Sequence, residues 1–165
     1  MDPIGGRSGW ARRIALISMI SMALPGRARA GDITAFVALP APTETWGRGY
    51  GATLSSTWFT ALNLEAEAAR LPGDRPDAAM TSFTAAALLA PPIGVLTPYG
   101  GFGFGVFRQT LGTASDTGTL RAFILGAKVK FGLVVLKGEY RHITLSGTPF
   151  LDMTARISAG AGISF

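Results

Sequence analysis

Charged residues recur at every second position in several short segments of the chain, a spacing that could build a network of ion pairs. Glu65 and Glu67 lie in one segment, Lys128 and Lys130 in another, and Lys137 begins a third. Side chains two residues apart share one face of a strand, so the charges of each segment would point the same way. The complete set is Glu65, Glu67, Lys128, Lys130, Lys137, Glu139, Arg141 and Arg156.

The signs of these eight charges nearly balance, which suits pairing inside a closed sheet. There, each charge would have a partner that compensates the cost of removing it from water. We therefore predict a lumen filled by paired charges. A path for protons or small ions, opened when the pairs rearrange, is the functional alternative. The solvated outer face of a soluble sheet is the third interpretation of the same pattern.

Nucleophilic chemistry has one pair of candidates, His142 and Thr144. A hydroxyl needs a correctly placed base and an orienting acid before it can attack a substrate. Glu139 is close in sequence, but its opposite parity would place it on the other face of a strand. We therefore assign no catalytic residue and place His142 beside Tyr140 in an interfacial belt of polar and aromatic side chains.

Other patterns that could bind a ligand are weak. Asp74 and Asp77 share one predicted loop, Asp116 and Asp152 lie on two others, and their spacing matches no calcium-ligand loop. The segment GFGFG lacks the lysine and the following helix of a phosphate loop. Because the chain has no cysteine, thiol catalysis and cysteine metal sites are excluded. We expect neither a metal nor a cofactor.

Turn-rich stretches divide the chain into eight segments that predict strands. Their ranges are 32–39, 49–57, 60–70, 79–90, 96–109, 119–131, 133–146 and 154–165. Long polar connections (PAPTETWGR, LPGDRPD, TLGTASDTG and SGTPFLD) follow the first, third, fifth and seventh segments, whereas the others are shorter. An even number of antiparallel strands with this alternation predicts an all-β, eight-stranded, antiparallel up-and-down barrel with one elaborated rim.

Two opposite orientations of this barrel fit the alternating faces. In one, Phe102, Phe104, Phe123 and Leu125 face lipid and the charges fill the lumen. In the other, the same four residues face inward, as in a soluble, secreted lipocalin-type barrel that binds an apolar ligand. No segment resembles a helix long enough to cover an apolar sheet, and a bilayer selects closed sheets without edges. We therefore favour a transmembrane barrel, with Trp46, Tyr50 and Trp58 in its interfacial belts.

The first 30 residues have the organisation of a secretory signal peptide. Arginines precede the apolar run IALISMISMAL, and an A-x-A site ends at Ala30. We predict a signal peptide over 1–30 and the barrel domain over 31–165. Residues 1–30 carry five arginines and one acid, so ten basic and nine acidic residues remain and the net charge of the rest is +1. The basic character therefore belongs to the signal peptide and does not indicate nucleic-acid binding.

The last segment alternates strictly and ends on an aromatic residue: Ile157, Ala159, Ala161, Ile163 and Phe165 share one face. The segments PYGGFGFGVF, LGAKVKF and EYRHITLSG precede this terminal segment. Their succession along the chain resembles that of the small outer-membrane β-barrel family of OmpA-like and OmpX-like proteins. The resemblance implies that the terminal residues are an assembly signal. It also implies the outer membrane of a Gram-negative bacterium as the location.

The partners implied by the resemblance are the barrel-assembly machinery, periplasmic chaperones, and membrane lipid with lipopolysaccharide. We expect a monomer with a structural or surface-interaction role. His142 and Thr144 also resemble the His-x-Ser pair of outer-membrane lipid A deacylases, although threonine replaces the serine here. Lipid A deacylation is thus the enzymatic alternative to a non-enzymatic barrel.

Overall fold

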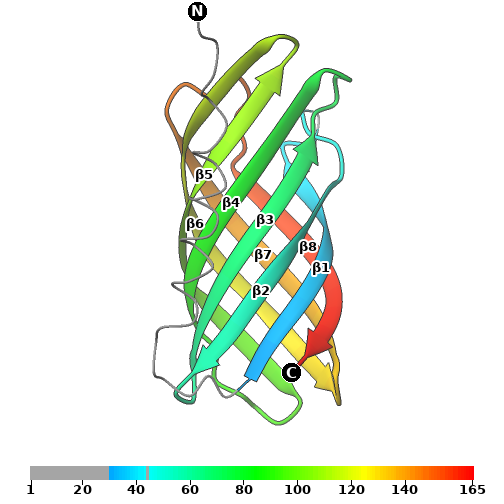
Figure 1. Cartoon of the computed structure of the whole chain (residues 1–165), viewed down its shortest axis with the longest axis vertical. Helices are drawn as coiled ribbons and strands as arrows, with labels where there is room; N and C mark the ends of the chain where they lie inside the picture. The colour runs from blue at the N-terminus through cyan, green and yellow to red at the C-terminus, as the bar shows by residue number, and fades with distance from the viewer. Residues whose placement is uncertain (1–29, 44) are drawn as a thin grey trace, which may run out of the picture.

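The computed structural model describes residues 30–43 and 45–165, which form one closed antiparallel sheet (Figure 1). Each strand pairs with its neighbours in sequence, and the last strand pairs with the first to close the barrel. The predicted eight-stranded antiparallel up-and-down barrel is confirmed. The strands are β1 (Ala30–Ala41), β2 (Gly49–Trp58), β3 (Leu62–Pro72), β4 (Ala78–Leu89), β5 (Leu96–Leu111), β6 (Ala114–Phe131), β7 (Val134–Ser146) and β8 (Ala155–Ser164).

The barrel has two rims of different construction. The start of β1 and the end of β8 lie at the same rim, which we call the terminal rim (Figure 1). The terminal rim also carries the connections 59–61, 90–95 and 132–133. The opposite rim carries the connections 42–48, 73–77, 112–113 and 147–154. None of the described residues belongs to a helix that is long and apolar enough to cross a membrane.

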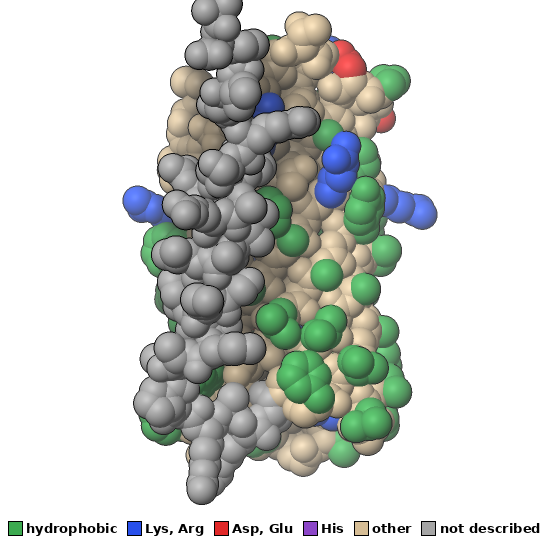
Figure 2. Space-filling model, in the orientation of Figure 1, with side chains coloured by type: hydrophobic (Ala, Val, Ile, Leu, Met, Phe, Trp, Pro, Cys, Tyr) green, Lys and Arg blue, Asp and Glu red, His purple; other side chains and the backbone are tan. Residues whose placement is uncertain are grey.

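Alternation along the strands turns apolar side chains outward. Phe102 and Phe104 on β5 are each 64% exposed, and the ring of Phe102 lies 5.3 Å from that of Phe123 on β6. Figure 2 shows hydrophobic side chains spread over the outer wall. Leu125 also faces outward. The lipocalin-type alternative is therefore wrong in its orientation, since the residues it would turn toward a ligand lie outside.

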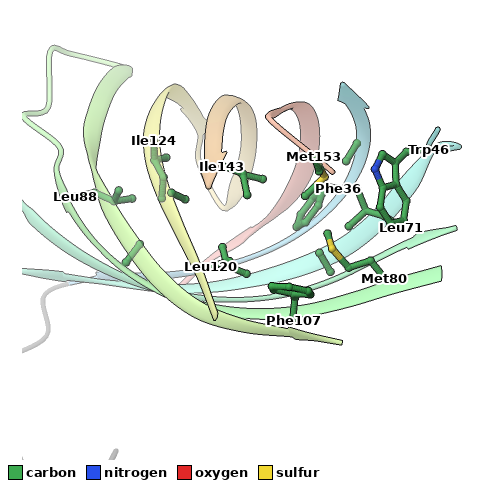
Figure 3. Packing of buried hydrophobic residues seen from close by; sticks show 14 of the residues in the cluster. Phe36, Trp46, Leu71, Met80, Leu88, Phe107, Leu120, Ile124, Ile143 and Met153 are labelled. Atoms are coloured by element: carbon green, nitrogen blue, oxygen red, sulfur yellow. The ribbon is translucent and has the colours of Figure 1, made fainter. Parts of the chain in front are cut away.

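Apolar side chains also pack inside the lumen (Figure 3), and a group of them lies toward the opposite rim. Phe36, Leu71, Met80 and Phe107 pack there, and Trp46 donates its indole N–H to the carbonyl oxygen of Asp152 at 2.9 Å. We call this group the apolar plug. The placement of Trp46 in an interfacial belt is wrong, because the connection after β1 folds inward and buries the ring.

The connection between β5 and β6 is much shorter than the sequence predicts. The two strands continue until Leu111 pairs with Ala114, and Gly112 adopts a positive φ of 59° in the turn. Glycine has no Cβ and accepts this conformation without strain. Polar residues in TLGTASDTG indicated a loop, but Ser115 accepts a hydrogen bond from Arg108 across the paired strands, at 3.4 Å. A strand segment that projects beyond the apolar wall contacts water, as a loop does, and therefore carries polar residues.

The two ends of the described chain close the ladder. Gly31 donates its amide to the carbonyl oxygen of Phe165 at 2.8 Å, and Phe165 donates to Gly31 at 2.9 Å. On β8, the side chains of the predicted assembly signal face outward, with Ile157, Ile163 and Phe165 strongly exposed. The signal peptide predicted over 1–30 lies outside the described residues apart from Ala30, the first residue of β1.

Candidate functional site in the barrel lumen

Two strands on opposite walls supply most of the charged side chains in the lumen. β3 carries Glu65 and Glu67, and β7 carries Lys137, Glu139 and Arg141. Four steps separate β3 from β7 in either direction around the eight strands, so these strands face each other. Their even spacing points every one of these side chains inward, where each is 6% exposed or less. Ion pairs between β3 and β7 must therefore cross the lumen.

The resulting group, which we call the central cluster, contains Glu65, Glu67, Lys137, Glu139, Arg141 and Arg156. Lys137 lies 2.7 Å from Glu65 and 2.9 Å from Glu139. Arg141 contacts Glu65 at 2.7 Å and Glu67 at 2.9 Å, and it also pairs with Glu139. Three carboxylates thus meet three cations, so the central cluster is neutral as a whole.

Arg156 joins the central cluster to the apolar plug. On β8, next to β7, it lies 2.8 Å from Glu67 and pairs in register with Arg141. The guanidinium carbon lies 5.1 Å from the centroid of the Phe36 ring, which belongs to the plug. A cation over an aromatic face is stabilised by the ring quadrupole. Arg156 therefore makes polar contact on one side and aromatic contact on the other.

Tyr99 lies between the central cluster and a second charged group. Its hydroxyl donates to Glu139 at 3.0 Å. Lys137 lies 5.6 Å above the ring and Lys128 lies 5.7 Å from its centroid. Both lysines are thus within cation–π distance of one ring. The Tyr99 ring therefore connects the two charged groups, because it contacts a lysine of each.

The second group, near the terminal rim, contains Asp32, Lys128 and Lys130. Asp32 on β1 lies 3.2 Å from Lys128 and 2.7 Å from Lys130, both on β6. Ser55 donates to Asp32 at 3.2 Å, and Lys130 donates to Ser164 at 3.1 Å. One carboxylate between two lysines leaves this group with a charge of +1.

The eight charges singled out from the sequence therefore lie in the lumen, but in two groups. Six belong to the central cluster, whereas Lys128 and Lys130 bind Asp32. Asp32 and Tyr99 were missed. Tyr99 shares the parity of the glycines at 101, 103 and 105, which was an available signal for an inward direction. Asp32 stands alone among apolar neighbours, so alternation did not single it out.

Carboxylate oxygens of Glu65, Glu67 and Glu139 lie within 4.8 Å of one another, close enough to share a metal ion. In this cluster the oxygens are already bound by cations. Lys137, Arg141 and Arg156 reach them at 2.7–2.9 Å. The chemistry of the arrangement is thus mutual neutralisation, which links opposite walls of the barrel.

His142 and Thr144 lie outside the lumen. Both are exposed on the outer face of β7, where they line a shallow groove with Arg121 and neighbouring phenylalanines. Glu139 is buried on the inner face of the same strand. The pair and the acid are thus separated by the barrel wall, and this geometry does not assemble the base and orienting acid that a hydroxyl nucleophile needs.

Comparison with solved structures shows the same fold in two proteins. Neisserial surface protein A (NspA) matches with a TM-score of 0.56 and 16% identity, over 82% of this chain and 93% of that one. The N-terminal β-barrel domain of Pseudomonas aeruginosa OprF matches with a TM-score of 0.56 and 16% identity, over 85% of this chain and 99% of that domain. No family model matches the chain, and no curated protein matches its sequence. The expected resemblance to small outer-membrane barrels is confirmed at the level of the fold.

Replacement of Arg141 by methionine tests the central cluster. We expect Arg141→Met to lower the free energy of unfolding by about 3–5 kcal/mol, because it leaves buried carboxylates without their cation. Urea unfolding in lipid vesicles, followed by tryptophan fluorescence, measures this change. Arg75→Met, in an exposed connection, is the matched control and should change stability by less than about 0.5 kcal/mol. Equal effects of the two substitutions would contradict the role given to Arg141.

Proposed function

We propose that the chain is a transmembrane barrel of a bacterial outer membrane, a rigid anchor whose opposite-rim connections form a contact surface. One observation carries this proposal: the polarity of the barrel is inverted, with phenylalanine and leucine outside and ion pairs inside. Lipid solvates such an exterior, and a closed sheet leaves no backbone group unpaired in the hydrocarbon region. The shared fold of the two solved barrels supports the proposal.

In this proposal the lumen is sealed by side chains and conducts no ions. An eight-stranded barrel encloses just enough space for side chains to fill. Here the central cluster spans the middle, and the apolar plug fills the part next to the opposite rim. The plug favours a seal over the alternative of an ion path, because apolar side chains offer no ligand to a dehydrated ion.

The direction of insertion follows from the rims. Short turns face the periplasm in barrels of this class. Three connections of the opposite rim have five residues or more, against one at the terminal rim, so we assign the terminal rim to the periplasm and the opposite rim to the outside. With this direction, the outward side chains from Ile157 to Phe165 are available to the assembly machinery as the predicted signal. Periplasmic chaperones and lipopolysaccharide remain the predicted partners before and after insertion.

Cell fractionation tests the location. We expect the protein in the outer-membrane fraction, migrating in a detergent gel differently before and after boiling, because a closed barrel resists detergent until it is heated. A protein recovered only from the soluble periplasmic fraction would contradict the proposal.

A charge on the outer wall tests the contact with lipid. Leu125 lies within the apolar part of β6, whereas Thr119 lies beyond Arg121 on the same face. We expect Leu125→Arg to lower the free energy of unfolding in vesicles by about 2 kcal/mol or more, and Thr119→Arg by less than about 1 kcal/mol. In a water-soluble barrel both positions would be solvated. Similar small effects at both positions would therefore speak against membrane insertion.

Planar bilayer recordings test the seal. We expect no steady conductance from the wild-type barrel, because the apolar plug and the central cluster fill the lumen. A steady ion current that disappears on heat denaturation would instead establish the ion path as the function of the charged groups.

A further inference from the structure

The outward faces of the strands carry charges of only one sign. Along β1 to β8, the outward ionisable residues with acidic or basic side chains are Arg70, Arg108, Arg121 and His142, and no acid is among them in the described chain. All three arginines are exposed, and none pairs with a described carboxylate. Figure 2 shows Lys and Arg side chains projecting from the upper part of the wall, above most of the hydrophobic side chains.

The two rims differ in where their basic side chains point. At the terminal rim, Lys128 and Lys130 turn into the lumen and bind Asp32. Toward the opposite rim, the arginines turn outward at the upper end of the apolar wall. Anionic groups of a membrane would therefore meet guanidinium groups that no described carboxylate neutralises, and they would meet them toward one rim only.

Two of these arginines are neighbours in the sheet. Arg70 on β3 pairs in register with Thr81 on β4, and Thr81 pairs with Arg108 on β5. Adjacent strands lie about 4.8 Å apart, so the Cα atoms of the arginines are separated by roughly 10 Å. Two guanidinium groups and a threonine hydroxyl thus present a short row of hydrogen-bond donors.

An apolar groove of about 610 Å³ lies directly below this row, on the outer wall from β1 to β5. Ala66, Ala68 and Ala85 form its floor, and Leu54 and Phe104 stand beside them. The groove is shallow and open along the outer wall, so a chain that lies in it keeps one side in contact with its surroundings. On β3 the floor continues from Ala68 to Arg70, two residues further along the same face, so the groove and the donors form one surface.

We propose that this surface binds one phosphorylated lipid of the outer leaflet, with an acyl chain on the alanine floor and a phosphate at Arg70 and Arg108. The guanidinium fork matches phosphate geometry. A groove whose outward side chains are apolar, with the polar residues of its lining buried, suits a hydrocarbon chain. A soluble anion would not need the groove, and an uncharged lipid would not need the arginines. This inference rests on the proposed membrane location and adds to it a specific lipid site.

Binding of lipid A to the protein purified from membranes in mild detergent tests the site. The probes are lipid A with two phosphates and the same lipid after enzymatic dephosphorylation, titrated by native mass spectrometry. We expect Arg70→Gln and Arg108→Gln each to weaken binding of the phosphorylated probe about tenfold, because each removes a charge-assisted hydrogen bond. Arg75→Gln removes the same charge from an exposed connection and should change binding less than twofold.

A substitution in the groove tests the acyl site independently. We expect Ala66→Leu to weaken binding several-fold by filling the floor, whereas Ala127→Leu, on the outward face of β6 and outside the groove, should leave it unchanged. Equal binding of the two probes by the wild-type protein would overturn the inference, as would equal losses in Arg70→Gln and Arg75→Gln. If either result is obtained with a wild-type protein that is heat-modifiable and lies in the outer membrane, only the proposed lipid site is overturned. A wild-type protein found in the soluble fraction overturns both the lipid site and the membrane location.

Discussion

The ion pairs that cross the lumen from β3 to β7 are the interaction on which the rest of the structure depends. Glu65 meets Lys137 and Arg141 only if the sheet closes with the observed register, because these strands are joined solely through their neighbours. A slip of one residue would turn the charges toward the apolar side. Buried pairs contribute little net stability over apolar packing, but an unpaired charge is costly, so the network disfavours incorrect closure.

The lumen contains two kinds of packing, one polar and one apolar. Around Arg141, polar side chains satisfy one another, and beyond Arg156 the aromatic ring of Phe36 begins an apolar plug. At this junction the Nη2 atom of Arg156 donates to Glu67 and the guanidinium lies over the Phe36 ring, whereas its buried Nε has no hydrogen-bond partner among the described residues. The second charged group at Asp32 then ends the polar interior near the terminal rim.

Period-two alternation was sufficient to predict the strands and the closed barrel, but it fitted both directions of the phenylalanines on β5. The outward direction was favoured because no segment resembles a helix that could cover an apolar sheet. It could not predict how the inward charges pair, since that depends on which strands stand opposite each other. Asp32 was missed because it is the one charged residue of its strand, and its partners on β6 are nearly a hundred residues away. Trp46 was misread because its position near a strand end does not reveal that the connection folds inward and buries the ring. The long β5–β6 hairpin was misread because polarity indicates contact with water and does not distinguish a loop from a strand that projects beyond the apolar wall.

That hairpin gives the barrel an asymmetric outline. β5 and β6 have 16 and 18 residues, whereas β2 and β8 have 10 each, and the added length is paired up to the turn at Gly112 (Figure 1). In the proposed orientation, a molecule that approaches from outside the cell would meet a preformed ladder on this side. Ordering a mobile loop on binding costs conformational entropy and weakens affinity. The paired hairpin is already ordered, so this entropy cost is small. The hairpin is therefore suited to contacts that favour a fixed shape over adaptation to many shapes.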